Sequence, residues 1–292
     1  MTNPVTTAPA DDLRERDPAE FLRRETVVRY GPVPDRIGGV AVAPGHCRLE
    51  GDAFLAHDEQ MRLLYRRGEG VIVELMGESR PGDEYLYLNG SVYAAAACIN
   101  GFYPIHASAV AHGGRVFAFT GPTGAGKSTL TAALGAAGLP LFCDDTLVLD
   151  LADPQVPLAL PGHKRLKLSP DALELTGAAP REKVHPAIDK FYADPVGGSW
   201  PGPLPLAQLV FLEEGAAIAL APITGAERMA RLDDDHYTAD FFRQSAGLDA
   251  AGWFRLKARL AGQIGMARLI RPRERTRFAD TVALARDWIG GQ

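Results

Sequence analysis

The sequence predicts an α/β fold in which a core built around a phosphate loop follows a small strand-rich N-terminal region. Residues 26–88 contain short β-like runs separated by Gly/Pro turns, and residues 121–128 fill the G-x-x-x-x-G-K-[ST] pattern between a strand-like and a helix-like run. Residues 238–289 are mainly helical in pattern. With 46% hydrophobic and 23% charged residues, the chain of 292 residues can bury a sizeable core in one or two domains.

The part of the chain before the loop divides into an arm and a small domain. Residues 1–20 are rich in Pro, Thr and charge, and this composition predicts a disordered arm. Residues 21–90 are predicted to form the strand-rich domain, and residues 91–292 the domain that contains the phosphate loop. The runs interpreted as strands are residues 26–30, 39–42, 53–55, 70–75 and 85–88. A helix is expected at residues 91–100, with Ser91 as its N-cap.

The glycine-rich loop is the most informative feature of the chain. A strand-like run at residues 115–120 precedes it and a short Ala- and Leu-rich helix at residues 128–137 follows, which is the context that a phosphate loop requires. Glycines let consecutive backbone N–H groups turn toward an anion at the N-terminus of the helix. The loop therefore predicts an ATP site, and the residues that would form it are Gly121, Pro122, Thr123, Gly124, Ala125, Gly126, Lys127, Ser128 and Thr129.

Two residues of the loop have specific roles in this chemistry. Lys127 would reach the β- and γ-phosphates as a point charge and so take part in catalysis. Ser128 supplies the hydroxyl that such loops direct at a metal, so Mg²⁺ is expected together with ATP. A Gly-rich turn without function is the alternative interpretation.

Two adjacent carboxylates, Asp144 and Asp145, lie within an apolar run at residues 141–150 that predicts a buried strand. Buried charges are costly unless a cation compensates them, and a magnesium ion beside ATP would do so. One carboxylate would hold the metal and the other would accept the proton of an incoming hydroxyl. We assign Ser128 and Asp145 to the metal, but strand alternation points the carboxylates to opposite faces and leaves their roles open. A strand end with both carboxylates solvated is the alternative.

A histidine lies on the strand that precedes the loop strand. Residues 105–111, the turn 112–114 and residues 115–120 have the pattern of a β-hairpin. His106 would then lie at the end of a neighbouring strand, near the γ-phosphate and the paired carboxylates, where it could take part in catalysis. A hydrogen-bonded structural histidine is the alternative.

Together, these segments resemble a known family of P-loop protein serine kinases. Residues 106–110, the hairpin turn, residues 121–129 and residues 143–145 are similar to the catalytic core of bacterial HPr kinase/phosphorylase and its relatives. The resemblance is strong over about residues 103–150. It implies the P-loop kinase core of the HPr kinase C-terminal domain type, with ATP bound at the loop, His106 in the active site, and the paired aspartates as metal-linked and base carboxylates.

One segment departs from the family pattern. HPr kinases carry a glutamate-containing, glycine-rich signature after the paired aspartates, whereas residues 161–168 contain no acidic residue. The chain therefore looks more like the HPr-kinase-related branch, some of whose members phosphorylate a C-terminal serine of a lasso-peptide precursor. In that case ATP phosphate or an acidic peptide terminus would contact one or more basic residues, namely Lys164, Arg165, Lys167 and Lys190, and a solvated basic strand is the alternative for each.

The C-terminal part predicts two paired strands followed by helices. The strands are expected at residues 205–212 and 216–220. The helices are expected at residues 238–244, 250–263 and 276–289. In the last of these the apolar residues fall on one face, as in a helix that covers a sheet.

Composition sets limits on partners and location. A net charge of −5, with no aromatic residues interleaved among the basic ones, argues against nucleic acid. No run approaches 18 uninterrupted apolar residues and residues 1–20 lack a signal pattern, so we expect no membrane partner and a cytoplasmic location. The three scattered cysteines predict neither a disulfide framework nor a zinc site. The oligomeric state stays open, and a homo-oligomer is one of the states that the sequence allows.

The expected activity is the transfer of the γ-phosphoryl group of ATP to a serine hydroxyl of a peptide or protein, including tailoring of a ribosomally made peptide precursor. A small-molecule kinase on the same scaffold is the first alternative. A nucleotide-binding regulatory module without catalysis is the second.

Overall fold

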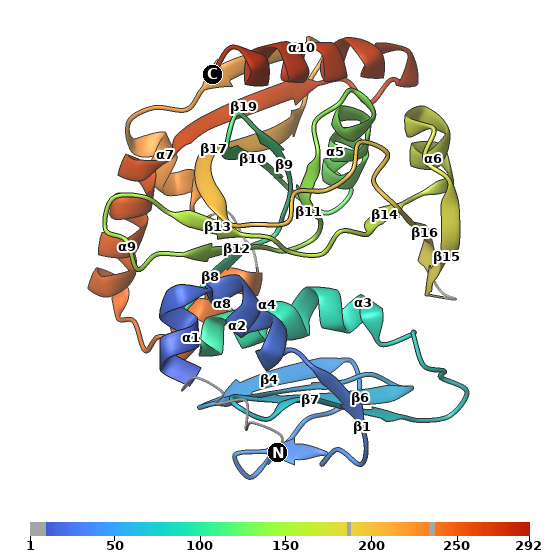
Figure 1. Cartoon of the computed structure of the whole chain (residues 1–292), viewed down its shortest axis with the longest axis vertical. Coiled ribbons are helices and arrows are strands. Elements are labelled where there is room, and N and C mark those ends of the chain that lie inside the picture. The colour runs from blue at the N-terminus through green and yellow to red at the C-terminus, as the bar shows by residue number, and fades with distance from the viewer. Residues whose placement is uncertain (1–9, 186–187, 234–236) are drawn as a thin grey trace, which may run out of the picture.

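The computed structural model describes residues 10–185, 188–233 and 237–292, and the protein has a mixed α/β fold with several sheets (Figure 1). A sheet in the N-terminal part lies below a larger sheet that carries the glycine-rich loop, and helices lie between and around them. The cores of these sheets are separate clusters of buried side chains. The pocket described below lies between these layers.

The N-terminal sheet is an antiparallel meander with one parallel strand added at its edge. Its order is β1-β7-β6-β5-β4, and its strands are β1 (Val28–Tyr30), β4 (His46–Glu50), β5 (Ala53–His57), β6 (Met61–Arg66) and β7 (Gly70–Leu75). Alternating residues such as Phe54, Leu63 and Val73 pack on one face against α4 (Tyr93–Ile99). The other face is covered by the two-stranded hairpin of β2 (Arg36–Ile37) and β3 (Val40–Ala41).

Part of the predicted arm is helical. The chain forms α1 (Ala10–Arg16) and α2 (Pro18–Glu25), so the prediction of disorder over residues 1–20 is wrong for residues 10–20, and residues 1–9 lie outside the described residues. Asp17 caps α2 by accepting a hydrogen bond from the Glu20 amide. Phe21 and Leu22 are buried against Phe102 and Leu160. Composition alone does not reveal this short apolar anchor.

The segment before α4 is helical rather than extended. Residues 85–88 were predicted as a strand, but the chain forms α3 (Tyr85–Tyr87) and a π-helical turn (Leu88–Val92) that continues into α4. A run of four alternating residues cannot distinguish the two structures. Ser91 lies within the π-helical turn and is not the N-cap of a helix at residues 91–100. This helical segment brings residues 86–91 to the edge of the pocket.

Within the described residues, the large sheet has nine strands, with the order β11-β9-β10-β17-β13-β12-β8, and with β19 and β18 beside β17. The strands are β8 (Tyr103–Ile105), β9 (Ala107–His112), β10 (Arg115–Thr120), β11 (Leu141–Cys143), β12 (Leu147–Asp150), β13 (Leu158–Leu160), β17 (Leu204–Glu214), β18 (Ala219–Pro222) and β19 (Gly265–Arg271). The predicted hairpin is present as antiparallel β9 and β10. The strand expected at residues 205–212 lies within β17, whereas the strand expected at residues 216–220 begins only at Ala219, as β18; both pair with β19.

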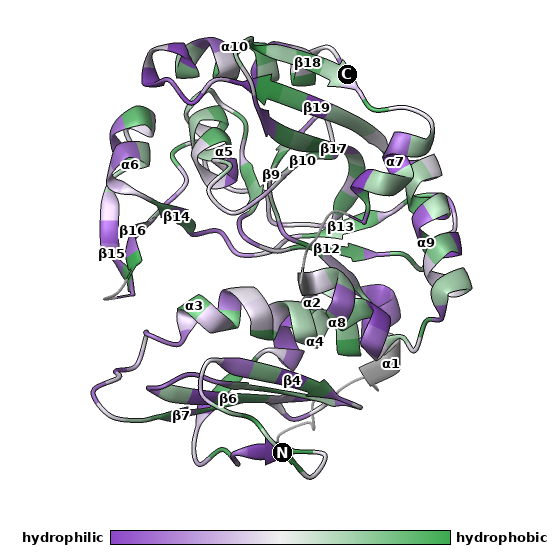
Figure 2. Ribbon diagram, turned by 180° about the vertical axis from the view of Figure 1, so that it is seen from behind, coloured by the Kyte–Doolittle hydropathy of each residue, from purple (hydrophilic) through white to green (hydrophobic). Residues whose placement is uncertain are grey.

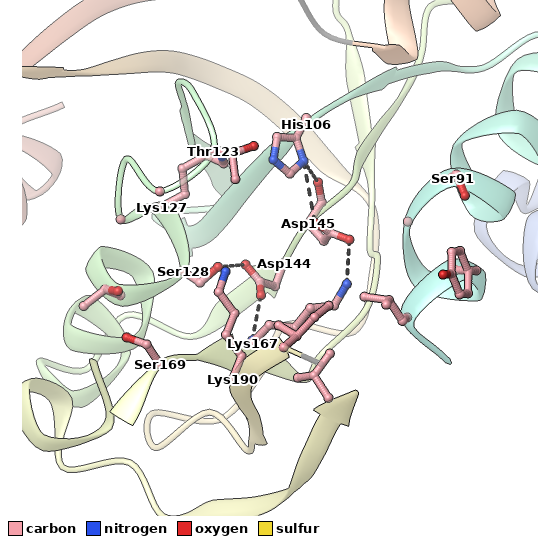
Figure 3. Close-up of a pocket in the computed structure, with 18 residues that line it drawn as sticks. Ser91, His106, Thr123, Lys127, Ser128, Asp144, Asp145, Lys167, Ser169 and Lys190 are labelled. Atoms are coloured by element: carbon pink, nitrogen blue, oxygen red, sulfur yellow. Dashed lines mark hydrogen bonds and ion pairs between the residues drawn. The ribbon is translucent and has the colours of Figure 1, made fainter. Parts of the chain in front are cut away.

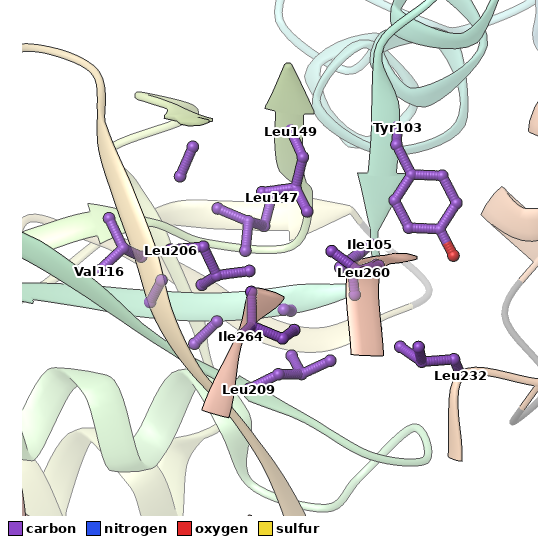
Figure 4. Close-up of a cluster of buried hydrophobic side chains, with 14 of the residues drawn as sticks. Tyr103, Ile105, Val116, Leu147, Leu149, Leu206, Leu209, Leu232, Leu260 and Ile264 are labelled. Carbon is purple, nitrogen blue, oxygen red and sulfur yellow. The ribbon is translucent and has the colours of Figure 1, made fainter. Parts of the chain in front are cut away.

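Helices cover both faces of the large sheet. On one face, α5 (Lys127–Ala136) and α10 (Phe278–Gly290) pack on residues such as Phe119, Val210 and Leu269. On the other face lie α7 (Ala226–Arg231), α8 (Tyr237–Ser245) and α9 (Ala250–Gln263). Figure 4 shows side chains from β8, β12, β17 and α9 meeting in this second cluster, including Ile105, Leu147, Leu206 and Leu260. These contacts fix the ends of β8, β10 and β12 near the loop.

A third, small sheet lies beside α5. Its order is β14-β16-β15, with β14 (Leu166–Leu168), β15 (Pro180–His185) and β16 (Ile188–Ala193), and α6 (Pro170–Thr176) follows β14. Leu166, Leu168 and Ala193 pack with Ala132 of α5. Figure 2 shows β10, β17 and β19 as largely hydrophobic, whereas α6 and β15 carry many hydrophilic residues. The small sheet therefore presents polar side chains to its surroundings, including the pocket.

Candidate active site

The glycine-rich loop links the end of β10 to the start of α5. Gly121, Gly124 and Gly126 have φ values of 143°, 81° and 85°, which residues with a side chain rarely adopt. Gly126 precedes the first turn of α5, and no side chain of the described residues caps this helix. The first backbone N–H groups of α5 are thus open to an anion, whose negative charge the helix dipole also favours.

The Lys127 side chain folds back over this loop. Its Nζ donates to the carbonyl oxygens of Gly121 at 2.8 Å and Pro122 at 3.3 Å, and the residue is only 7% exposed. Burial lowers the pKa of Lys127 to about 8, while the negative charges of Asp144 and Asp145 oppose that shift. The loop therefore holds a cation close to the helix N-terminus.

The carboxylate of Asp144 is buried and hydrogen-bonded on both oxygens. Ser128 Oγ donates to Asp144 Oδ1 at 2.8 Å, and the Lys167 amide donates to Oδ2 at 3.1 Å. Burial raises the pKa of Asp144, and the negative charge of Asp145 raises it further. The Ser128 hydroxyl therefore lies beside Asp144, whereas the sequence paired Ser128 with Asp145 as metal ligands, an assignment that stays a prediction.

Asp145 lies at a sharp turn between two short strands. The prediction of one strand over residues 141–150 is wrong at this point, because β11 pairs with β9 and β12 pairs with β8. Among the described non-glycine residues, only Asp145 has a positive φ, 71°. The amide of Thr146 donates to the Asp144 carbonyl at 2.9 Å and closes the turn. This backbone conformation is uncommon for a residue with a side chain and is often found at functional sites.

The side chain of Asp145 has two basic neighbours. Lys167 Nζ lies 2.8 Å from its Oδ2, and His106 Nδ1 lies 3.6 Å from its Oδ1. Burial raises the pKa of Asp145, but the positive charge and hydrogen bond of Lys167 outweigh this and hold the pKa below its usual value. Asp145 is therefore an ionised carboxylate, and its pKa is shifted in the opposite direction to that of Asp144.

His106 occupies the break between β8 and β9. Its Nδ1 donates to the backbone carbonyl of Asp145 at 2.8 Å, and its own carbonyl accepts a 3.0 Å hydrogen bond from Thr120 Oγ1. Burial lowers the pKa of His106, and the positive charge of Lys127 lowers it further. The histidine is thus neutral near pH 7 and fixes the turn that carries Asp145.

All these side chains line one cavity of about 460 Å³, within the roughly 300–1,000 Å³ typical of small-molecule sites. Figure 3 shows the loop residues and Ser91 on opposite sides of this pocket, with Asp144, Asp145 and Lys167 between them. Its lining residues are Leu86, Tyr87, Gly90, Ser91, His106, Thr123, Gly124, Gly126, Lys127, Ser128, Thr129, Asp144, Asp145, Lys167, Ser169, Val184, Ile188 and Lys190. The pocket thus joins the loop to the N-terminal part and to the small sheet.

Comparisons with known proteins give similarities to solved structures only. No protein-family model matches the chain. No curated protein matches it either. Among solved structures, the HPr(Ser) kinase/phosphatase from Coxiella burnetii is similar with a TM-score of 0.32 and 12% sequence identity, over 64% of this chain and 97% of that chain. At this TM-score the similarity assigns neither a family nor a function, and what the pocket can do rests on its own geometry.

The predicted basic residues separate into two groups. Lys167 and Lys190 line the pocket, whereas Lys164 and Arg165 are not among its lining residues. Lys164 donates to the Phe142 carbonyl, and burial lowers its pKa to about 8. Arg165 pairs with Glu182 and stacks over the Tyr192 ring at 4.2 Å. Three predicted loop residues, Gly121, Pro122 and Ala125, are likewise absent from the lining of this pocket in the described structure.

Sequence reasoning missed several contributors to the site. Ser169 lines the pocket and caps α6, and the Ser-Pro pair that starts this helix was a usable signal. Tyr87 and Ser91 reach the pocket only because residues 85–92 are helical. Arg271 donates to the Ala125 carbonyl from β19, and nothing in a linear sequence places it beside the loop.

A metal would have few protein ligands here. Across the described ranges, no three His, Cys, Asp or Glu side chains are grouped as a metal site. Mg²⁺ suits such a place, because it commonly takes one or two carboxylates and completes its shell with water and phosphate oxygens.

The helices of the described chain include none that is long and apolar enough to span a membrane.

Proposed function

We propose that the protein is an ATP-dependent phosphotransferase that moves the γ-phosphoryl group of ATP to a serine hydroxyl of a peptide or protein. The observation that carries the proposal is that Lys127, Ser128, Asp144 and Asp145 line one pocket at the N-terminus of α5. Phosphoryl transfer depends mainly on positioning and on charge stabilisation, and an anion site next to ionisable carboxylates supplies both.

The loop and the first turn of α5 would hold the phosphates. Their backbone N–H groups would bind phosphate oxygens, and Lys127 would exchange its contacts with the Gly121 and Pro122 carbonyls for the β- and γ-phosphates. Ser128 and Asp144 would hold Mg²⁺, since their oxygens already lie 2.8 Å apart. When bound, the metal supplies charge neutralisation at the β- and γ-phosphate oxygens.

An adjoining cavity has room for part of the nucleoside. This cavity, of about 170 Å³, shares Gly124, Gly126, Thr129 and Ser169 with the main pocket. Its other lining residues include Arg271, Arg275 and Phe278. The nucleoside would lie there, on the side of the loop away from Asp145, which leaves the γ-phosphate facing the carboxylates.

Asp145 would act as the base in the transfer. As the acceptor oxygen bonds to the γ-phosphorus, the acceptor proton would pass to the Asp145 carboxylate, and the bond from the γ-phosphorus to the bridging oxygen would break to release ADP. Lys167 keeps this carboxylate ionised, and His106 fixes its backbone. Lys127 would stabilise the charge that develops on the phosphoryl oxygens.

The acceptor would enter from the wall opposite the loop. Ser91 lies on that side of the pocket (Figure 3), and Leu86, Tyr87 and Gly90 of the same helical segment also line the pocket. Val184 and Ile188 of the small sheet border the same space and give it an apolar edge. The proposal of a serine acceptor on a peptide or protein rests on the resemblance of residues 103–150 to HPr kinases. A lasso-type peptide precursor is the most specific acceptor that this resemblance suggests.

The proposal is tested by incubating the protein with γ-labelled ATP, Mg²⁺ and a panel of serine peptides and small hydroxyl metabolites, followed by mass spectrometry. Lys127→Ala and Asp145→Asn serve as controls. We expect phosphoserine in at least one peptide with the wild-type protein, none with Lys127→Ala, and far less with Asp145→Asn over the same time. Transfer only to a metabolite would favour the small-molecule kinase, and ATP binding without any transfer would favour the regulatory module.

A further inference from the structure

The pocket contains a lysine that none of the steps above uses. Lys190 on β16 is partly buried and lines the same cavity as Lys127, Ser128 and Asp144. The amines of Lys127 and Lys167 have partners, namely loop carbonyls and Asp145. In the described structure, the side-chain amine of Lys190 has neither a hydrogen bond nor an ion pair. The positive charge of Lys190 is therefore available to an anion that enters the pocket.

The strand register explains why Lys190 reaches the pocket. Lys167 of β14 lies opposite Tyr192 of β16, and Lys190 is two residues away from Tyr192 along the same strand. Side chains two residues apart on a strand point to the same face, so Lys167 and Lys190 share a face of the small sheet. Figure 3 shows the Lys190 side chain directed toward the part of the pocket lined by Ser128 and Asp144.

The charge of Lys190 acts on the phosphate end of the pocket. Lys190 and Lys127 line the same cavity, and Lys127 lies at the start of α5, next to the glycine-rich loop. Two lysines that repel each other across a cavity create a site for an anion between them. Lys190 is not among the described lining residues of the adjoining cavity, so it lies on the side of the transferred phosphate.

We propose that Lys190 binds the γ-phosphate of ATP, and that this adds a contact between the small sheet and the loop that the diphosphate state lacks. The inference rests on the proposed function, because it takes the loop to be the phosphate site. β16 belongs to a sheet separate from the one that carries the loop, so a γ-phosphate held by both Lys127 and Lys190 bridges two parts of the molecule. ADP lacks the group that makes this bridge.

Calorimetric titrations with ADP and with the β,γ-imido analogue of ATP, both with Mg²⁺, test the assignment. Lys190→Met keeps the length of the side chain but removes the charge. We expect it to weaken analogue binding by at least about tenfold, the usual effect of losing a hydrogen bond to a charged group, and to leave ADP binding within about twofold. Lys190→Arg should restore most of the difference.

Lys183→Met is the matched control. Lys183 lies on β15 opposite Phe191, so its side chain is on the other face of the same sheet, and it is exposed. This variant should bind both nucleotides like the wild-type protein. Hydrogen exchange gives a second readout, because the ATP analogue, but not ADP, should slow exchange of the β16 amides in the wild-type protein and not in Lys190→Met.

The results distinguish a failure of the Lys190 assignment from a failure of the proposed nucleotide site. Equal weakening of ADP and analogue binding, or no weakening of either, would overturn the γ-phosphate assignment while leaving the nucleotide site in place. The same holds if Lys183→Met has as large an effect as Lys190→Met. If the wild-type protein binds neither nucleotide, the proposed function itself fails, and the role of Lys190 fails with it.

Discussion

The Ser128 hydroxyl donates a 2.8 Å hydrogen bond to Oδ1 of Asp144 and so joins the first turn of α5 to the turn between β11 and β12. The two residues come from separate sequence patterns, and the rest of α5 and β11 lie between them along the chain. Oδ2 of Asp144 accepts the Lys167 amide, which ties the small sheet to the same carboxylate. Because both oxygens of Asp144 are engaged, its position is fixed before any ligand binds.

This pair should act as a unit in metal binding. Ser128→Ala and Asp144→Asn should each raise the Mg²⁺ concentration for half-maximal phosphotransferase activity by about 10–100-fold, the range seen when groups around a metal are removed. Because they share one ion, the double variant should lose less than the product of the two effects. A magnesium titration of the activity of all four proteins measures this. Fully multiplicative losses would show that the residues act independently.

Asp145 should control the pH dependence of transfer. Asp145→Asn should lower the rate by at least about a hundredfold while ATP still binds, because it removes the base. Lys167 lowers the pKa of Asp145, so Lys167→Met should raise that pKa and move the acidic limb of the pH–rate profile to higher pH. A limb that stays in place, or moves to lower pH, would contradict this assignment.

Gly126 should tolerate no side chain. Its φ of 85° is left-handed, and an added Cβ would clash with Arg271 Nη2. Gly126→Ala should cost about 1–2 kcal/mol in backbone strain and also weaken ATP binding by displacing Arg271 from the loop. Gly138→Ala is the control, because its φ is 94° but its Cβ would meet nothing within 4 Å. Thermal melts and titrations with ATP compare them, and unchanged ATP binding by Gly126→Ala would count against the loop as phosphate site.

His163 should make stability fall in mild acid. Burial lowers its pKa from 6.5 to about 4, so the folded state resists the proton that the unfolded chain accepts. The contribution of His163 leaves the free energy of unfolding at its full value above pH 6.5. It lowers that free energy as the pH falls to 4, by at most about 3 kcal/mol. Urea unfolding across this range should show a steeper loss for the wild-type protein than for His163→Gln. Parallel curves for the two proteins would refute the prediction.

Local patterns predicted the elements that have a strong periodicity or a motif. The helix at residues 250–263 is α9, the strand at residues 70–75 is β7, and the hairpin before the loop is β9 and β10. The strands β4 and β6 were missed, since charged residues interrupt their apolar pattern. The run at residues 85–88 was assigned to a strand because four residues carry too little periodicity to show a helix.

The site was predictable where its residues are close in sequence. The loop residues and the paired aspartates lie within residues 121–145, and the pocket brings most of them together. The turn at Asp145 was not predictable, because it depends on β11 and β12 pairing with different strands. The wall formed by Leu86, Tyr87 and Ser91 also depends on tertiary contacts. The sequence showed which residues of the site are acidic or basic, but not which of them pair with one another.

The most direct test of the central claim is an equilibrium titration of Mg·ATP into the wild-type protein and into Lys127→Met. If the loop and α5 form a triphosphate site, the wild-type protein should bind with a Kd within roughly 1 μM to 1 mM, the usual range for enzyme substrates, and the variant at least about tenfold more weakly. No binding by the wild-type protein at 1 mM nucleotide, or equal binding by the two proteins, would contradict the account.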